Sequence, residues 1–156
     1  MKTKVFEIEF WQMPAEMDER SRKDFEDIRS LHLELRGSKQ AISLERVRRF
    51  FSSGGWLCVA RDVNNDRSIV GIASLSVRCS IDKVLGNLER VVTKEQFQRR
   101  GVGRSLVEAL IQKAREVGCE RLRLTYDTDK IHLGRFYRSF GFVDGYLNST
   151  HLKLEL

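Results

Sequence analysis

The sequence predicts an α+β fold with a mixed, mostly antiparallel central sheet and helices on both faces. The chain has 156 residues, which is the size of one domain, and we expect a single domain over residues 1–156. Segments of alternating hydrophobicity are interleaved with segments of helical periodicity. One unit, residues 88–126, has the order strand, helix, strand, so its two strands are expected to be parallel with a right-handed connection.

The first third of the chain predicts one strand and two helices. Residues 5–10 alternate between apolar and polar side chains, which indicates a strand with one solvated face. Residues 18–35 carry apolar side chains at near-helical spacing, and this helix is expected to stop before Gly37. Ser43 is expected to cap a second, short helix.

The middle of the chain predicts an antiparallel hairpin. Residues 56–60 and residues 68–77 are rich in apolar and β-branched side chains. The turn signal Asn64-Asn65-Asp66 lies between them. A glycine pair at residues 54–55 separates this hairpin from the preceding helix.

The parallel unit follows. Gly86 is expected to open a strand over residues 88–93, and residues 94–98 are expected to form a loop. A strongly amphipathic helix then runs from Gly101 until Gly118 stops it.

The C-terminal elements are short. Residues 121–126 predict a strand, and residues 132–140 predict a helix that ends at Gly141. Residues 150–156 alternate and predict a closing strand.

Composition favours an anionic partner and argues against several classes of protein. Lys and Arg number 28 and Asp and Glu 22, a net charge of +6, which suits a phosphorylated cofactor, a nucleic acid or an acidic substrate. The three cysteines form no CxxC pattern, so we expect neither a disulfide framework nor a metal site. No apolar run reaches the roughly 18 residues of a membrane span, and Glu7 and Glu9 interrupt any signal-peptide core. We expect a cytoplasmic protein.

The segment with the clearest chemistry begins at Gln98. Two glycines, Gly101 and Gly103, lie where a helix begins, and a helix N-terminus offers free backbone N–H groups to an anion. Three arginines crowd the same end, where cations are unfavourable unless an anion binds among them. The alternative is that the glycines serve a turn and the arginines are a solvated rim. The segment comprises Gln98, Arg99, Arg100, Gly101, Val102, Gly103, Arg104 and Ser105.

This segment resembles the Gln/Arg-x-x-Gly-x-Gly/Ala acetyl-CoA signature of the GNAT superfamily of N-acetyltransferases. Residues 88–93 look like the family's fourth strand, and residues 121–125 like its fifth. Residues 134–142 look like its Phe-Tyr-x-x-x-Gly-Phe segment. The resemblance is specific over about residues 56–143 and weak in the N-terminal third.

Two positions depart from the family pattern. The family usually has proline after the fourth strand, where this chain has Lys94-Glu95. It often has asparagine about six residues before the Phe-Tyr pair, where this chain has Lys130, an ammonium group suited to a phosphate.

The resemblance implies transfer of an acetyl group from acetyl-CoA to a primary amine by direct attack in a ternary complex. The diphosphate would bind backbone amides at the start of the helix, and the pantetheine arm would add to the edge of the fourth strand. A backbone N–H near Val92 would face the thioester oxygen. The implied donor-binding residues are Val91, Val92, Thr93, Gln98, Arg99, Arg100, Gly101, Val102, Gly103, Arg104, Ser105, Lys130 and Arg135.

Two catalytic side chains are expected. The resemblance implies that Tyr137 would protonate the leaving thiolate. Glu89 is the best-placed carboxylate, just before the donor-binding residues of the fourth strand, and would accept the proton of the amine. Water or Asp127 are alternatives to Glu89 as the base. Without the resemblance, Tyr137 would be read as a packing residue and Glu89 as a solvated carboxylate beside Arg90.

Two other functions remain open at this stage. The basic charge would suit a nucleic-acid-binding module, although no RRM-like pattern is present, and we expect no nucleic acid or membrane partner. A non-catalytic acetyl-CoA-binding relative would keep the donor site without turnover. The acceptor, a small-molecule or peptide amine, is expected to contact residues 11–40, 78–86 and 144–150, and the chain could form a homodimer.

Overall fold

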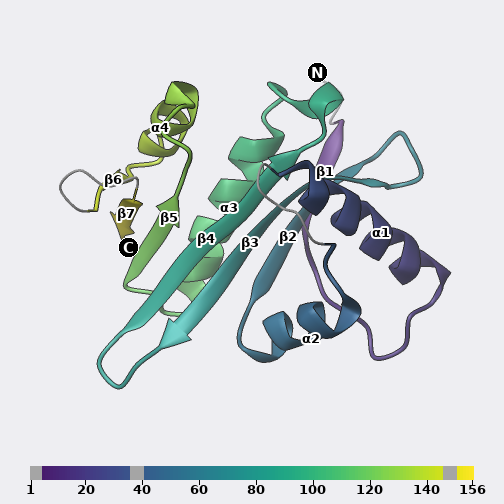
Figure 1. Cartoon of the computed structure of the whole chain (residues 1–156), viewed down its shortest axis with the longest axis horizontal. Coiled ribbons are helices and arrows are strands. Elements are labelled where there is room, and N and C mark those ends of the chain that lie inside the picture. The colour runs from purple at the N-terminus through teal and green to yellow at the C-terminus, as the bar shows by residue number, and fades with distance from the viewer. Residues whose placement is uncertain (1–4, 36–40, 146–150) are drawn as a thin grey trace.

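The computed structural model describes residues 5–35, 41–145 and 151–156 (Figure 1). The sequence-based expectations for residues 36–40 and 146–150, including part of the expected acceptor surface, lie outside these ranges. The elements, in chain order, are β1 (Phe6–Trp11), α1 (Glu19–Glu34), α2 (Leu44–Ser52), β2 (Trp56–Asp62), β3 (Ile69–Cys79), β4 (Val84–Thr93), the 3₁₀ helix η1 (Glu95–Phe97), α3 (Val102–Glu116), β5 (Arg121–Thr125), α4 (Ile131–Arg138), β6 (Val143–Asp144) and β7 (His151–Glu155).

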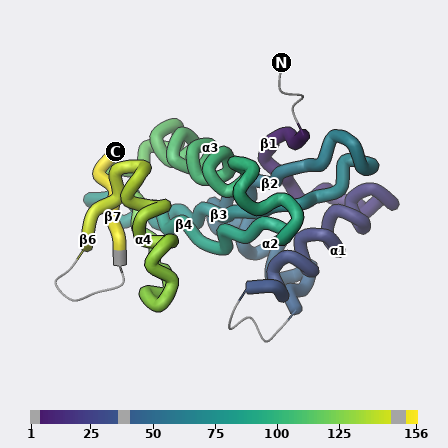
Figure 2. The backbone as a smooth tube through the Cα atoms, turned by 90° about the horizontal axis from the view of Figure 1, so that it is seen from above, coloured from purple at the N-terminus to yellow at the C-terminus, as the bar shows by residue number. Residues whose placement is uncertain are grey.

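The described strands form one seven-stranded sheet in the order β1-β2-β3-β4-β5-β7-β6. The β4–β5 pair is parallel and every other neighbouring pair is antiparallel. Helix α3 covers one face of the sheet, and α1 and α2 cover the other (Figure 2). The predicted α+β class, the β2–β3 hairpin and the parallel strand–helix–strand unit are therefore confirmed.

The core under α3 explains why this helix forms. Its apolar side chains recur at helical spacing and are fully buried against the sheet, with Leu106, Leu110 and Ala114 at 0% exposure. Burying each leucine contributes roughly 1.5–3 kcal/mol relative to leaving it in water. Gly118 ends the helix with a φ of +81°, the left-handed conformation that was expected there.

The helices on the opposite face have side-chain caps. The Asp18 carboxylate accepts a hydrogen bond of 2.7 Å from the Ser21 backbone N–H at the start of α1. The Ser43 hydroxyl accepts one of 3.2 Å from the Arg46 N–H, so its predicted role as a cap is confirmed. Leu31 of α1 is completely buried in the core below these helices.

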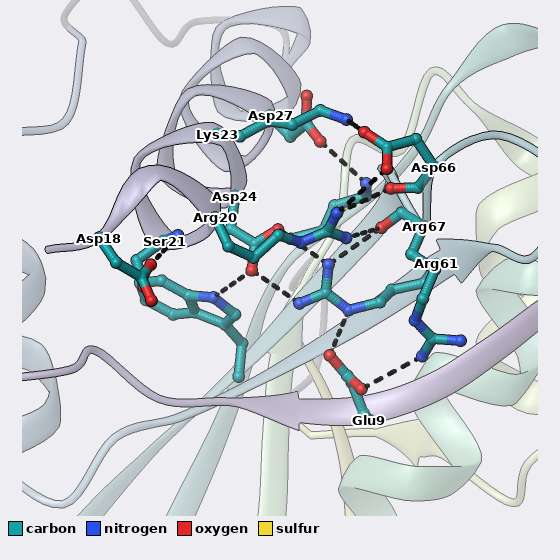
Figure 3. Close-up of polar contacts among 12 residues, drawn as sticks. Glu9, Asp18, Arg20, Ser21, Lys23, Asp24, Asp27, Arg61, Asp66 and Arg67 are labelled. Atoms are coloured by element: carbon teal, nitrogen blue, oxygen red, sulfur yellow. Dashed lines mark hydrogen bonds and ion pairs between the residues drawn. The ribbon is translucent and has the colours of Figure 1, made fainter.

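A buried ionic network ties α1 to the sheet (Figure 3). Arg61 of β2 makes two hydrogen bonds to the Asp24 carboxylate, at 2.8 and 2.7 Å, and both side chains are buried. The Trp11 indole N–H donates to the same carboxylate at 3.1 Å, and Glu9 pairs with Arg61. Burial acts to raise the pKa of Asp24, but the hydrogen bonds and charge of Arg61 outweigh it, so the pKa is lowered.

Three details differ from the sequence-based expectations. Strand β4 begins at Val84, and Gly86 lies inside it rather than before it. A Cβ at Gly86 would lie 2.5 Å from Leu122 and 2.9 Å from Leu75, so glycine is required by packing there. The expected loop at residues 94–98 contains the helix η1, and the two-residue strand β6 was not anticipated.

Other features of the described ranges bear on partners. No helix within them is long and apolar enough to cross a membrane. No group of three or more metal-ligating side chains occurs among the described residues. Cys58 and Cys119 are buried and Cys79 is exposed, and all three are free thiols.

Candidate active site

The parallel strands β4 and β5 separate along their length. They pair at only three positions, from Leu85 opposite Arg121 to Asn87 opposite Arg123. On its other side, β4 stays paired with β3 as far as Thr93. Among the described strands, the edge of β4 that faces β5 therefore has no partner beyond Asn87, and its backbone groups there are available to a ligand.

A β-bulge lies where the strands separate. On β4, Arg90 and Val91 together oppose the single residue Ala73 of β3. Arg90 has a φ of +57°, the left-handed region that side chains rarely adopt. The Ser74 hydroxyl donates a hydrogen bond of 3.1 Å to the Glu89 carbonyl oxygen beside the bulge. Such a bulge bends the strand and redirects the side chains after it.

Backbone directions after the bulge show which amides face the opening. The Lys94 N–H donates to the Val70 carbonyl of β3 at 2.8 Å. Because N–H groups alternate sides along a strand, the Val92 N–H also points toward β3. The N–H groups of Val91 and Thr93 therefore point toward the gap between β4 and β5.

A cavity of about 660 Å³ lies at this gap. It brings together both predicted catalytic residues, Glu89 and Tyr137, with the predicted donor contacts Val91 and Lys130. Its complete lining is Leu35, Leu88, Glu89, Arg90, Val91, Thr125, Tyr126, Asp127, Lys130, Leu133 and Tyr137.

Tyr137 reaches the cavity from α4. Its ring packs edge-on against Phe136 and Phe142, with centroids 5.1 and 6.2 Å away, and the residue is 7% exposed. Burial raises the pKa of Tyr137 to about 12, so the phenol stays protonated at neutral pH. Tyr137 therefore lines the cavity as a neutral phenol, a group that can donate a proton.

Two carboxylates line the cavity. Glu89 is exposed and makes no ion pair with any described residue. Asp127, just after β5, accepts a hydrogen bond of 3.2 Å from the Asp129 backbone N–H. On the α1 side, burial lowers the pKa of His32, and the positive charge of Arg90 lowers it further.

The predicted diphosphate segment forms a tight turn into α3. Gly101 is the N-cap with a φ of +85°, which favours glycine. The N–H groups of Val102, Gly103 and Arg104 belong to the first turn, where helical amides lack intrahelical acceptors. The Ser105 N–H is already bound to the Gly101 carbonyl at 3.0 Å, so only its side chain is left for a ligand.

The fold itself does not require glycine at position 103. A Cβ there would approach only Phe136, at 3.7 Å, an ordinary van der Waals distance. The absence of a side chain instead leaves the helix start uncovered, as close approach of a diphosphate requires.

The arginines of this turn have different environments. The Arg104 guanidinium lies 4.6 Å from the Phe140 ring centroid and donates to the Ser139 hydroxyl at 2.8 Å. Arg100 lies 5.5 Å from the centre of the Phe97 ring. Arg99 is exposed with a φ of +60°. Arg99 and Arg100 form no ion pair with a carboxylate in the described ranges.

The remaining predicted donor contacts lie on either side of the turn. The Gln98 side-chain amide donates to the Thr93 carbonyl at 3.2 Å, which fixes the turn to the end of β4. Arg135 is exposed on α4 and does not line the cavity.

Several cavity residues were not predicted from the sequence. Leu35, at the end of α1, falls within residues 11–40, where the acceptor was expected to bind. Leu133 of α4 and Arg90, which the bulge displaces, were not anticipated. A signal was available for Thr125 and Tyr126, because they stand at the carboxyl end of a strand in a parallel pair, where ligands commonly bind.

These features define a class of protein. The mixed sheet with one opened parallel pair, together with a glycine turn leading into the connecting helix, is the architecture of GNAT-type acetyltransferases. The model of the acetyltransferase (GNAT) family matches residues 8–142. The chain belongs to this family, as its motifs indicated.

Solved structures agree on the fold, and one curated protein matches part of the sequence. An acetyltransferase from Trypanosoma brucei superposes with a TM-score of 0.73 at 20% identity, covering 90% of this chain and 94% of that one. A chain of the NatC complex, solved with Gag peptide and CoA, gives a TM-score of 0.73 at 19% identity, covering 96% and 99%. The spermine/spermidine N(1)-acetyltransferase of Bacillus subtilis is 38% identical over 56 residues, only 35% of this chain and 37% of that protein.

Proposed function

We propose that the protein transfers an acetyl group from acetyl-CoA to a primary amine of a small molecule or peptide, by direct attack in a ternary complex. The observation that carries this proposal is the cavity where β4 and β5 separate. It places a protonated phenol, a carboxylate and unpaired strand amides around one space.

The residues present suit the donor. Backbone amides of Val102, Gly103 and Arg104 would hold the diphosphate, with Arg99 and Arg100 adding positive charge. The open edge of β4 would bind the amide-bearing pantetheine arm as a neighbouring strand would. Thr93 would contribute its N–H, while its carbonyl is already bound by Gln98.

The same geometry supports a proton path. An amine of lysine type has a pKa near 10.4, so Glu89 would first remove a proton, directly or through water. The amine nitrogen would then bond to the thioester carbon, and the resulting oxyanion would accept a hydrogen bond from the Val91 N–H. As the carbon–sulfur bond breaks, Tyr137 would give its proton to the thiolate, and the tyrosinate would take the second proton that the attacking nitrogen must lose. The products are an N-acetylated amine and free CoA.

The position of Glu89 favours it over Asp127 as the base. Glu89 directly precedes the bulge and lies on the strand whose amides would hold the donor, whereas Asp127 follows β5 on the other side of the gap. The acceptor is not defined by relatives, since the match to the polyamine enzyme covers only part of each chain.

A thiol-release assay with acetyl-CoA and a panel of amines tests the proposal, with mass spectrometry of the acetylated product. We expect release that depends on an amine. Calorimetry run in parallel separates two failures: acetyl-CoA binding without turnover for any amine would indicate a non-catalytic relative, and no binding would overturn the donor site.

A further inference from the structure

On the face of the sheet opposite α3, helix α1 contacts β3 and β4, and Figure 1 shows neither α1 nor α2 over β5. Leu88, Leu122 and Leu152 point into the core under α3. Because side chains alternate along a strand, their neighbours on β4, β5 and β7 point to the opposite side. On this opposite side, β5 and β7 carry Arg121, Arg123 and Lys153. Arg78 of β3 lies on the same side, because its neighbour Val77 packs against the α3 core. We call these four cations the basic face.

Charge on this side is unbalanced among the described residues. Glu155 pairs with Arg121 at 2.6 Å and more distantly with Lys153, at 3.8 Å. Arg123 makes no ion pair within the described ranges, and it lies directly opposite Lys153 in the β5–β7 register. Like charges directly opposite one another destabilise a sheet. An anion bound between Arg123 and Lys153 would remove this repulsion.

The basic face is continuous with the catalytic cavity. Thr125, two residues beyond Arg123 on the same side of β5, lines the cavity. Asn87 is directly opposite Arg123, and Glu89 follows two residues later on β4. From strand spacing and rise, the backbone of Glu89 lies about 8 Å from that of Arg123, or somewhat more where the strands separate.

We infer that the acceptor carries an anionic group, a carboxylate or a phosphate, which Arg123 and Lys153 bind while the amine lies at Glu89. The inference rests on the proposed function, because it assigns the substrate class of the same site. It also predicts that polycationic amines are poor acceptors, since the two cations would repel their distal charges.

The test compares matched amines in the thiol-release assay. The probes are 6-aminohexanoate and its amide, 3-aminopropyl phosphate and 3-aminopropanol, and spermidine. We expect kcat/KM to be at least tenfold higher for the anionic member of one pair than for its neutral partner. A difference in the first pair would indicate recognition of a carboxylate, and a difference in the second would indicate recognition of a phosphate. Equal rates within both pairs, or preference for spermidine, would overturn the inference.

Two variants test whether the anionic group of the acceptor binds at Arg123. Arg123→Gln should raise KM for the anionic acceptor at least tenfold while rates with its neutral partner stay the same. Arg115→Gln is the matched control, because it removes the same charge from an exposed position on α3. An equal effect of both variants would indicate general charge attraction and reject the site.

A failure of the proposed function gives a different result. If no amine releases thiol, the same anionic probes are titrated calorimetrically into protein saturated with CoA. Binding that Arg123→Gln abolishes would support the anion site without the acetyl transfer, and no binding would reject both. A gel shift of duplex DNA that Arg123→Gln abolishes, without any acceptor discrimination, would assign the basic face to nucleic acid instead.

Discussion

The two halves of the sheet are built in different ways. Between β3 and β4 the pairing extends over most of both strands, from Cys79 opposite Val84 to Gly71 opposite Thr93. Between β4 and β5 it covers three positions. The first half is further secured by the buried contact between Asp24 and Arg61.

This difference separates stability from function. Where strands remain paired, their backbone groups are satisfied within the protein and serve the fold. Where β4 loses its partner, the same groups are left for a substrate. Substitutions in the closed half should therefore act on unfolding, and substitutions around the opening should act on binding and turnover.

The largest effect is expected in the closed half. Arg61→Ala leaves the Asp24 carboxylate buried without its main partner, which should lower the free energy of unfolding by about 3–5 kcal/mol. Urea denaturation followed by circular dichroism measures this. Arg49→Ala removes an arginine from the exposed pair with Glu45 and should change stability little. Equal midpoints for the two variants would show that the buried pair does not secure this half.

The next largest effect concerns the leaving group. Tyr137→Phe keeps the ring and removes one proton donor, so turnover should fall by about 10² while acetyl-CoA affinity is unchanged. Tyr126→Phe makes the same chemical change in the same cavity and should reduce turnover less. A folded Tyr137→Phe variant with wild-type turnover would make Tyr137 a packing residue.

The pH dependence of turnover tests the assignment of Tyr137 as the proton donor. Because burial raises the pKa of Tyr137 to about 12, the phenol should remain protonated through pH 10. Turnover should therefore show no alkaline loss attributable to this group below that pH. A falling limb that appears in the wild type below pH 10 and disappears in Tyr137→Phe would contradict the raised pKa.

A smaller effect, on binding alone, is expected at the glycine turn. Gly103→Asp adds bulk and negative charge where the diphosphate would bind, and should weaken acetyl-CoA binding more than tenfold in calorimetry. Gly103→Asn adds similar bulk without charge, so the difference in acetyl-CoA affinity between the two variants measures the effect of the negative charge. Both should fold, since a Cβ has room at this position. Wild-type affinity in both would sink the donor-site proposal.

The smallest effect at neutral pH is expected from the base. Glu89→Gln should lower turnover at neutral pH and recover partly at high pH, where more of the amine is already unprotonated. Glu95→Gln, an exposed carboxylate in η1, is the matched control. A pH–rate profile with unchanged height and shape would transfer the role to water or to Asp127.

Much of the fold could be predicted from the sequence, because local patterns determine many of its elements. The periodicity of α3, the cap at Ser43 and the glycine stop at Gly118 are determined by neighbouring residues, and all three were confirmed. The Gly86 position was misjudged because its requirement for glycine comes from Leu75 and Leu122, which belong to other strands.

The cavity was less predictable for the same reason. Tyr137 was singled out through a family motif and Glu89 through its place on the fourth strand, and both line one cavity. Leu35 belongs to the segment expected to bind the acceptor, but no local pattern showed that this particular residue would reach the cavity from a helix distant in sequence. The buried partner of Arg61 was also invisible, because a single arginine in a strand usually indicates a solvated position.

The bulge at Arg90 reverses which alternate residues of β4 face each side of the sheet. Before it, Leu88 faces the α3 core. After it, Val91 packs against that same core although it lies three positions further along, an odd interval that simple alternation would place on opposite faces. Val92 accordingly joins the core under α1 and α2. Substitutions meant to alter the cavity side of β4 must therefore be chosen separately for the two segments of the strand. Even-numbered residues face α3 before the bulge, and odd-numbered residues face it afterwards.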